Sequence, residues 1–150
     1  SIGFVDARFR RDVGAPRADG AGSIVAAGDR VPYVPRWSGT LSAQYGFPLA
    51  RGMQAFVRSE WQYSGRYRRA PSVRSVAYDP RIYRGQANDM AMLRIGISRD
   101  GWDLTAFIEN MFDDHAILYR NVELAPATGS PVREAAQRPR TIGLSGRIAL

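Results

Sequence analysis

The sequence contains no cysteine, no lysine and a single histidine. The absence of cysteine excludes disulfide bonds, thiolate catalysis and cysteine-based zinc sites. The lone His115 gives no basis for a nucleophile–histidine pair, and the chain has no glycine-rich phosphate-binding motif. We therefore predict that the protein is not an enzyme, and we expect no cofactor and no metal.

Long hydrophobic runs are also absent. No stretch approaches the ~18 consecutive apolar residues of a transmembrane helix. Residues 1–11 lack both an initiator methionine and the basic start and apolar core of a signal peptide, so we expect a fragment of a larger protein. A transmembrane β-strand needs only ~10 residues, with apolar side chains at alternate positions. A membrane location therefore stays open.

The charge is strongly positive, and arginine supplies all of the cations. The chain has 21 Lys+Arg, every one an arginine, against 14 Asp+Glu, for a formal net charge of +7. Arginine binds phosphate and carboxylate groups through two parallel hydrogen bonds. Anionic partners are thus expected.

Helical periodicity is scarce, whereas polar and apolar residues often alternate. In residues 102–110, for example, Trp102 and Leu104 alternate with Asp103 and Thr105. Such period-two alternation predicts β-strands with one apolar and one polar face. The pattern predicts about six strands, at residues 4–10, 36–47, 53–67, 91–97, 102–110 and 141–150.

The predicted connections alternate in length. Residues 48–52 and 99–101 are short, and Asp100-Gly101 favours a two-residue hairpin. The regions near 11–34, 68–88 and 113–139 are long, rich in Pro, Gly, Arg and Ala, and show no periodicity. Long unstructured loops argue against a compact soluble domain. In an outer-membrane barrel they are typical of the extracellular side.

Aromatic residues lie at both ends of the predicted strands, as in the interfacial girdles of a membrane barrel. We assign the girdles to Trp37, Tyr45, Trp61, Tyr63, Trp102 and Phe112. The opposite face carries charges that would be unfavourable in a dry core but ordinary in a wet lumen. These lumen or ligand candidates are Arg58, Glu60, Arg94, Asp103 and Glu109. A soluble antiparallel sheet with one solvated face is the alternative.

We therefore predict an all-β fold, an antiparallel up-and-down meander that forms the C-terminal arc of a large transmembrane β-barrel. About six strands cannot close a barrel alone, because single-chain membrane barrels begin at about eight. The last predicted strand ends at Leu150.

Three stretches resemble the C-terminal region of TonB-dependent outer-membrane receptors. "AGDRVPYVPRWSGTLSAQYGF" (27–47) is similar to the Gly-Arg-x-Pro-x-x-Pro lead into a late strand, with Asp29 separating Gly28 from Arg30. "IENMFDD" (108–114) resembles the Asn-Leu-Phe-Asp segment, with Met111 in place of leucine. "RPRTIGLSGRIAL" (138–150) resembles the closing strand, although Leu150 stands where the family usually has an aromatic residue. "GFVDARF" (3–9) resembles an upstream strand.

This resemblance implies a barrel of about 22 strands, plugged by an N-terminal domain. It implies uptake of a scarce ligand, of the siderophore, cobalamin or saccharide class, energised through TonB. The implied partners are outer-membrane lipid and lipopolysaccharide, TonB through the missing N-terminal region, and the barrel-assembly machinery through the closing strand. The implied location is the outer membrane of a Gram-negative bacterium.

"FIENMFDDH" (107–115) gathers three carboxylates with His115. A metal site requires ligands that converge on one point. Strand alternation instead sends Glu109 and Asp113 toward the lumen and Phe112 toward lipid, with Asp114 and His115 already in the loop. We therefore interpret the stretch as a strand end, where Asn110 and Asp113 bind the turn backbone.

The connection from Arg66 to Arg84 is rich in arginine and tyrosine. We predict an extracellular basic loop that is either simply solvated or in contact with lipopolysaccharide or an anionic ligand. Its arginines are Arg66, Arg68, Arg69, Arg74, Arg81 and Arg84. The competing hypothesis is a soluble basic β-domain that binds an anionic polymer such as nucleic acid. No nucleic-acid-binding motif supports that alternative, so we expect no nucleic acid partner.

Overall fold

The structure, a computed structural model, describes residues 1–14, 25–73, 75, 78–122 and 132–149. Eight strands and one short 3-10 turn form the fold, without an α-helix in these ranges. The elements are β1 (Ile2–Phe4), β2 (Trp37–Pro48), η1 (Ala50–Gly52), β3 (Gln54–Ser64), β4 (Asn88–Arg99), β5 (Trp102–Glu109), β6 (Ile117–Val122), β7 (Val132–Ala136) and β8 (Thr141–Ile148). No helix in the described part of the chain is long and apolar enough to cross a membrane.

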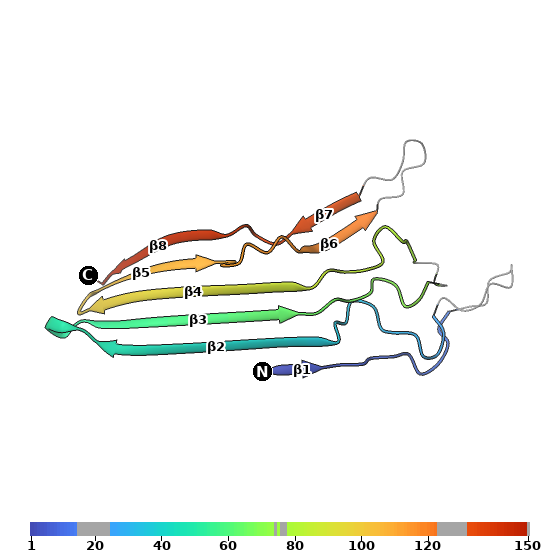
Figure 1. The fold of residues 1–150 in the computed structure, drawn as a ribbon, viewed down its shortest axis with the longest axis horizontal. Helices are drawn as coiled ribbons and strands as arrows, with labels where there is room; N and C mark the ends of the chain where they lie inside the picture. The colour runs from blue at the N-terminus through green and yellow to red at the C-terminus, as the bar shows by residue number, and fades with distance from the viewer. Residues whose placement is uncertain (15–24, 74, 76–77, 123–131, 150) are drawn as a thin grey trace.

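Six of the strands form one antiparallel sheet in the order β1-β2-β3-β4-β5-β8 (Figure 1). Every neighbouring pair is antiparallel. The predicted all-β class and the six-stranded meander are thus confirmed.

The register aligns apolar residues across the whole sheet. Tyr45 lies opposite Val57, Val57 opposite Ile95, Ile95 opposite Ala106, and Ala106 opposite Leu144. Residues directly opposite one another in antiparallel strands project from the same side. One apolar face therefore runs unbroken from β2 to β8, and the alternation in the sequence predicted it.

The residues next to these along each strand form the opposite face of the sheet. Gln44 lies opposite Arg58, Arg58 opposite Arg94, Arg94 opposite Phe107, and Phe107 opposite Gly143. A shift of one residue in any pair would exchange the two faces. The register is therefore fixed by the same alternation that separates polar from apolar side chains.

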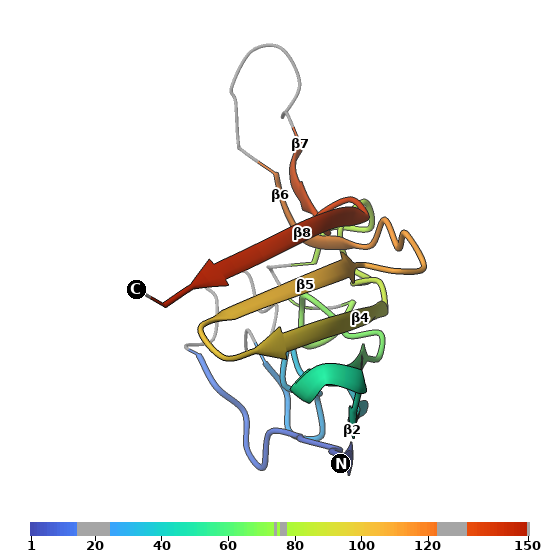
Figure 2. The same cartoon turned by 90° about the vertical axis from the view of Figure 1, so that its left-hand side faces the viewer.

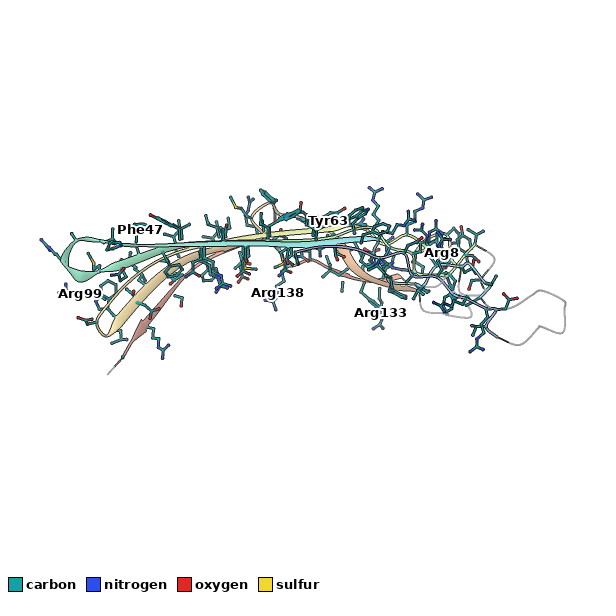
Figure 3. The ribbon with its side chains drawn as sticks, turned by 90° about the horizontal axis from the view of Figure 1, so that it is seen from below. Arg8, Phe47, Tyr63, Arg99, Arg133 and Arg138 are labelled. Atoms are coloured by element: carbon teal, nitrogen blue, oxygen red, sulfur yellow. The ribbon has the colours of Figure 1, made fainter. Side chains whose placement is uncertain are left out.

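The sheet is curved, and its apolar face is the convex one. Figure 3 shows β5 and β8 bending away from the plane of β2, with Phe47 and Tyr63 on the outer side of the bend. Among the described residues, the buried apolar side chains are only Val25 and four alanines. The large apolar side chains on the convex face stay exposed, and for Leu41, Ile142, Leu144 and Ile148 the exposed fraction is 67–76%. This face has no second layer over it in the described structure.

Short and long connections lie at opposite ends of the sheet (Figure 1). At the short end, Leu49 N donates to Met53 O at 2.8 Å around η1. Asp100 and Gly101 form the predicted two-residue hairpin, since Arg99 lies opposite Trp102. Gly101 has a φ of 81°, which favours glycine.

Two predictions about the connections need correction. The region 113–139 is not without secondary structure, because it contains the hairpin β6–β7. This hairpin extends beyond the long-connection end of the main sheet (Figure 1) and rises past the β8 edge (Figure 2). The first strand was predicted at residues 4–10, but β1 spans Ile2–Phe4, so only Phe4 of the predicted strand lies in it. Beyond β1, pairing continues irregularly with the next segment, as in the bridge between Arg8 and Arg30. Leu150, the predicted end of the last strand, lies outside the described residues.

Candidate functional site

The concave face carries a polar hollow of about 460 Å³ that contains three of the five predicted lumen residues. Arg94 Nη2 lies 3.5 Å from Glu109 Oε1 across β4 and β5. Arg58 donates from Nε to Glu60 Oε1 at 2.6 Å, two residues along β3. The hollow is lined by Gln44, Phe56, Arg58, Arg94, Thr105, Phe107, Glu109 and Ser145.

The other two predicted lumen residues lie outside this lining. Glu60 borders it through its bond to Arg58. Asp103 lies nearer the short turns, opposite Arg147 on β8. Arg94 and Glu109 thus pair across two strands, whereas Arg58 pairs along its own strand.

Two phenylalanine rings form the apolar part of the hollow, and each lies over a glycine of the neighbouring strand. A Cβ added to Gly96 would overlap the Phe56 ring and lie 2.9 Å from Thr105 Oγ1. A Cβ on Gly143 would overlap the Phe107 ring in the same way. Aromatic rings packed on glycine stabilise sheets where no Cβ intervenes. The sequence predictions missed this feature. The signal for it was the presence of glycines and phenylalanines on the same face of neighbouring strands.

The predicted girdle aromatics lie at the strand ends. Trp37 and Trp102 begin β2 and β5, and Tyr45 lies near the end of β2. Trp61 stacks on Tyr63 with ring centroids 6.0 Å apart, and Trp61 Nε1 donates to Asp89 Oδ1.

Phe112 follows β5 in the turn and borders an apolar hollow of about 630 Å³. That hollow is also lined by Leu41, Trp61 and Leu93 of the apolar face. The aromatic side chain therefore continues the apolar surface past the end of the sheet.

Residues 110–114 form a tight turn whose backbone Asn110 binds, as the sequence interpretation proposed, whereas Asp113 binds the backbone before β8 and not the turn. Asn110 is 1% exposed and has a φ of 49°. Its Oδ1 accepts from Asp114 N at 2.9 Å, and its Nδ2 donates to Asp114 O at 2.9 Å and to Arg138 O at 2.8 Å. Asp113 Oδ1 accepts from Arg140 N at 3.0 Å. The side chains of this stretch thus serve the turn and the start of β8.

The acidic residues of this stretch do not converge. Asp114 Oδ2 accepts from Asp89 N at 2.9 Å, while Glu109 pairs with Arg94 on the concave face. In the described ranges, no group of three His, Cys, Asp or Glu residues could hold a metal ion.

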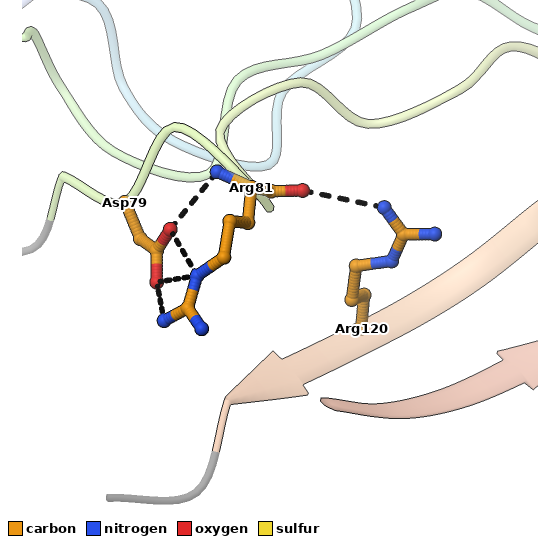
Figure 4. Close-up of polar contacts among 3 residues, drawn as sticks. All are labelled: Asp79, Arg81 and Arg120. Carbon is orange, nitrogen blue, oxygen red and sulfur yellow. Dashed lines mark hydrogen bonds and ion pairs between the residues drawn. The ribbon is translucent and has the colours of Figure 1, made fainter. Parts of the chain in front are cut away.

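The predicted basic loop divides into different environments. Arg69 is buried and donates to Ile82 O at 3.4 Å and to Tyr67 Oη at 3.3 Å. Arg81 Nη2 donates to Asp79 Oδ2 at 2.6 Å (Figure 4). Arg69 and Arg81 therefore stabilise the conformation of the loop itself. Arg74 lies outside the described residues.

The Asp79–Arg81 pair also meets the β6–β7 hairpin. Arg120 Nη1 donates to the main-chain oxygen of Arg81 at 3.3 Å (Figure 4). The Arg120 guanidinium also pairs with Glu134 of β7. The hydrogen bond from the Arg81 side chain lowers the pKa of the Asp79 carboxyl.

Arg66, Arg68 and Arg84 share one pocket of about 230 Å³ with Arg30 and Arg36 from the preceding long connection. The sequence predictions did not include Arg30 and Arg36, because only the fold brings the two connections together. Tyr33 N donates to Arg68 O at 2.8 Å and joins them directly.

Asp6 provides a carboxylate beside this pocket. Its Oδ1 lies 3.5 Å from Arg36 Nη2 and 3.8 Å from Arg30 Nη2. A hydrogen bond from Arg8 lowers the pKa of Asp6. Partial burial, followed by the neighbouring charge of Arg36, lowers the pKa of the Arg30 guanidinium. Positive charge is thus concentrated at the long-connection end of the sheet.

No known protein-family model matches the chain, and no curated protein or solved structure shows significant similarity to it. The arrangement of the side chains is what indicates function. That arrangement offers an exposed apolar convex face, a polar concave face and a basic pocket at one end.

Proposed function

We propose that this chain is one arc of the wall of an outer-membrane β-barrel. The observation that carries the proposal is the curved single-layer sheet whose large apolar side chains lie uncovered on the convex side. A soluble sheet buries its apolar face against another layer. A membrane barrel instead turns that face outward to lipid and lines its interior with polar residues.

The dimensions and connections of the sheet support the same proposal. Strands β2, β3 and β4 have 12, 11 and 12 residues, enough for the ~9–11 residues with which a tilted strand crosses a bilayer. Short turns lie at one end and long connections at the other, as in outer-membrane barrels. The edge strands β1 and β8 would pair with further strands of the barrel.

Within that class, we infer a TonB-dependent receptor, in which this chain is part of an active transporter and not an enzyme. The three family-like stretches support this inference, and in the structure they fall on β2, on the turn after β5 and on β8. The transported ligand would be scarce, of the siderophore, cobalamin or saccharide class. Lipopolysaccharide, TonB and the barrel-assembly machinery would be the partners.

The gene upstream of Ser1 and the location of its product test this proposal. We expect the upstream sequence to encode a signal peptide and a plug-like domain. We also expect the full-length protein to sediment with the outer membrane. Absence of both upstream elements would contradict the receptor assignment.

The rival class, a soluble basic β-domain, predicts a different result in the same cells. Its product would remain soluble in the absence of detergent and bind oligonucleotides with a steep dependence on salt. A membrane arc would aggregate without detergent, because the convex apolar face would be exposed to water.

A further inference from the structure

The pocket at the long-connection end is built from two segments that lie far apart in the sequence. Arg30, Val31, Val34 and Arg36 come from the connection before β2, and Arg66, Tyr67, Arg68, Tyr83 and Arg84 come from the connection between β3 and β4. Arg68 and Arg84 lie opposite each other in a bridge between the two arms of the second segment. Five arginines therefore line one hollow of about 230 Å³.

Backbone hydrogen bonds hold the two arms of the second segment together around the pocket. Arg69 N donates to Tyr83 O at 2.9 Å, and Gly85 N donates to Tyr67 O at 3.0 Å. The Arg68 guanidinium lies over the Tyr83 ring, 5.9 Å from its centroid. Stacking on an aromatic ring orients a guanidinium without using its hydrogen-bond donors. The donors of Arg68 therefore remain available to a ligand.

Negative charge is scarce at this site. No carboxylate is among the residues that line the pocket. Within the described ranges, no Asp or Glu lies within ion-pair distance of Arg66, Arg68 or Arg84. Asp6 reaches only the Arg30 and Arg36 side. Like charges this close repel one another, and an anionic ligand would relieve that repulsion.

We propose that this pocket binds a phosphomonoester group. A phosphomonoester carries a charge of about −1.5 to −2 near neutral pH and three strong acceptor oxygens. Arginine forks match that geometry with two hydrogen bonds each. A single carboxylate carries half the charge and fewer acceptors for five guanidinium groups. Val31, Val34 and Tyr67 add an apolar wall, which suits a sugar or similar group attached to the phosphate.

The phosphate has two potential sources, a soluble sugar phosphate or the phosphorylated headgroup of a saccharolipid in the same membrane. Both present the same chemistry to the arginines. The binding proposal goes beyond the barrel proposal and does not depend on it, because the pocket is formed by residues of this chain alone.

Titration of full-length protein in detergent with glucose 1-phosphate, followed by ³¹P NMR and calorimetry, tests the proposal. We expect saturable binding, and glucose without phosphate should not bind. Arg68→Gln and Arg84→Gln should each weaken binding by about tenfold or more, since each removes charge-assisted hydrogen bonds. Arg99→Gln, at the opposite end of the sheet, makes the same charge change and should alter affinity less than about twofold.

Two further measurements test the part that charge plays in binding. Asp6→Asn should tighten binding, because it frees Arg30 and Arg36 from their competing carboxylate. Binding should weaken as the pH falls from neutrality through about 6, where the phosphomonoester gains a proton while arginine stays charged.

The source is distinguished with protein reconstituted in phosphatidylcholine nanodiscs. If the lipid headgroup occupies the pocket, adding lipid A to the nanodisc will reduce glucose 1-phosphate binding. If the ligand is soluble, lipid A will have no effect on that binding.

Equal binding by Arg99→Gln, Arg68→Gln and Arg84→Gln would overturn the proposal, as would binding of citrate but not of glucose 1-phosphate. Neither result would affect the barrel proposal, which fails only if the convex face does not contact lipid.

Discussion

The side-chain amide of Asn110 donates a hydrogen bond of 2.8 Å to the main-chain oxygen of Arg138. This bond ties the end of β5 to the residues that lead into β8, although the β6–β7 hairpin intervenes in the sequence. Because the buried Asn110 side chain also makes two bonds to Asp114, both of its polar atoms are hydrogen-bonded.

Asn110→Ala should therefore destabilise the protein by about 2–3 kcal/mol, because it leaves buried carbonyl and amide groups without partners. Asn88→Ala, which removes one half-buried bond to Gln137, should cost about 1 kcal/mol. Urea unfolding of detergent-solubilised protein, followed by tryptophan fluorescence, measures both. Equal losses in the two variants would contradict the role of Asn110.

Gly96→Ala should destabilise the sheet by about 1–3 kcal/mol, because the new methyl group would occupy the position of the Phe56 ring. Gly46 lies opposite Phe56 on the other side, but a Cβ there would meet its nearest atom at 3.7 Å. Gly46→Ala should thus be neutral or slightly stabilising. The same unfolding measurement compares them, and a greater loss for Gly46→Ala would show that the ring does not lie over Gly96.

Leu41→Arg should prevent stable insertion into a bilayer, whereas Ser42→Arg should be tolerated. The two residues are adjacent on β2 and lie at nearly the same depth, but Leu41 belongs to the convex face and Ser42 lies opposite Glu60. An arginine on the lipid face costs about 2–4 kcal/mol at the bilayer midplane. Folding into lipid vesicles, monitored by heat-modifiable gel mobility, checks this difference. Similar folding yields would argue against a lipid-facing Leu41.

The Asp79–Arg81 contact should be lost in acid. The pKa of Asp79 in the folded protein is lowered by the Arg81 hydrogen bonds, below the value of about 3.9 for a free aspartate. Its contribution to stability is therefore complete above that pH and is lost as the pH falls through the lowered pKa. NMR titration of the Asp79 carboxyl carbon should show this lowered pKa. Arg81→Gln should raise it toward the free value, and Arg84→Gln should leave it unchanged.

The sequence predicted most of the main sheet, because the alternation of polar and apolar residues determines which side chains share a face. The same alternation restricts the register of each strand pair to one that keeps the two faces apart. Alternation identified the apolar and polar faces, and the Asp100-Gly101 pair identified a hairpin. The same alternation predicted that Glu109 would face away from Ile108. These features are local, so residues within a few positions of one another are enough to determine them.

Features outside the regular alternation of the main sheet were not predicted. The β6–β7 hairpin was missed because "ILYRNV" mixes apolar and polar residues on both faces. In the basic pocket, Arg30 and Arg36 lie beside residues of the connection between β3 and β4, the first of which is Arg66. Only the pairing of the strands brings these two parts of the chain together. Arg69 was expected in an exposed loop, yet it is buried against Tyr67 and Ile82.

The central claim, that the convex face contacts lipid, can be tested residue by residue because the chain has no native cysteine. Single cysteines at positions 141–148 of β8, labelled with a fluorophore in reconstituted vesicles, report contact with lipid-bound quenchers. We predict strong quenching at Ile142, Leu144, Gly146 and Ile148 and weak quenching at Thr141, Gly143, Ser145 and Arg147. Uniformly weak quenching along β8, or quenching without a period of two, would contradict the account.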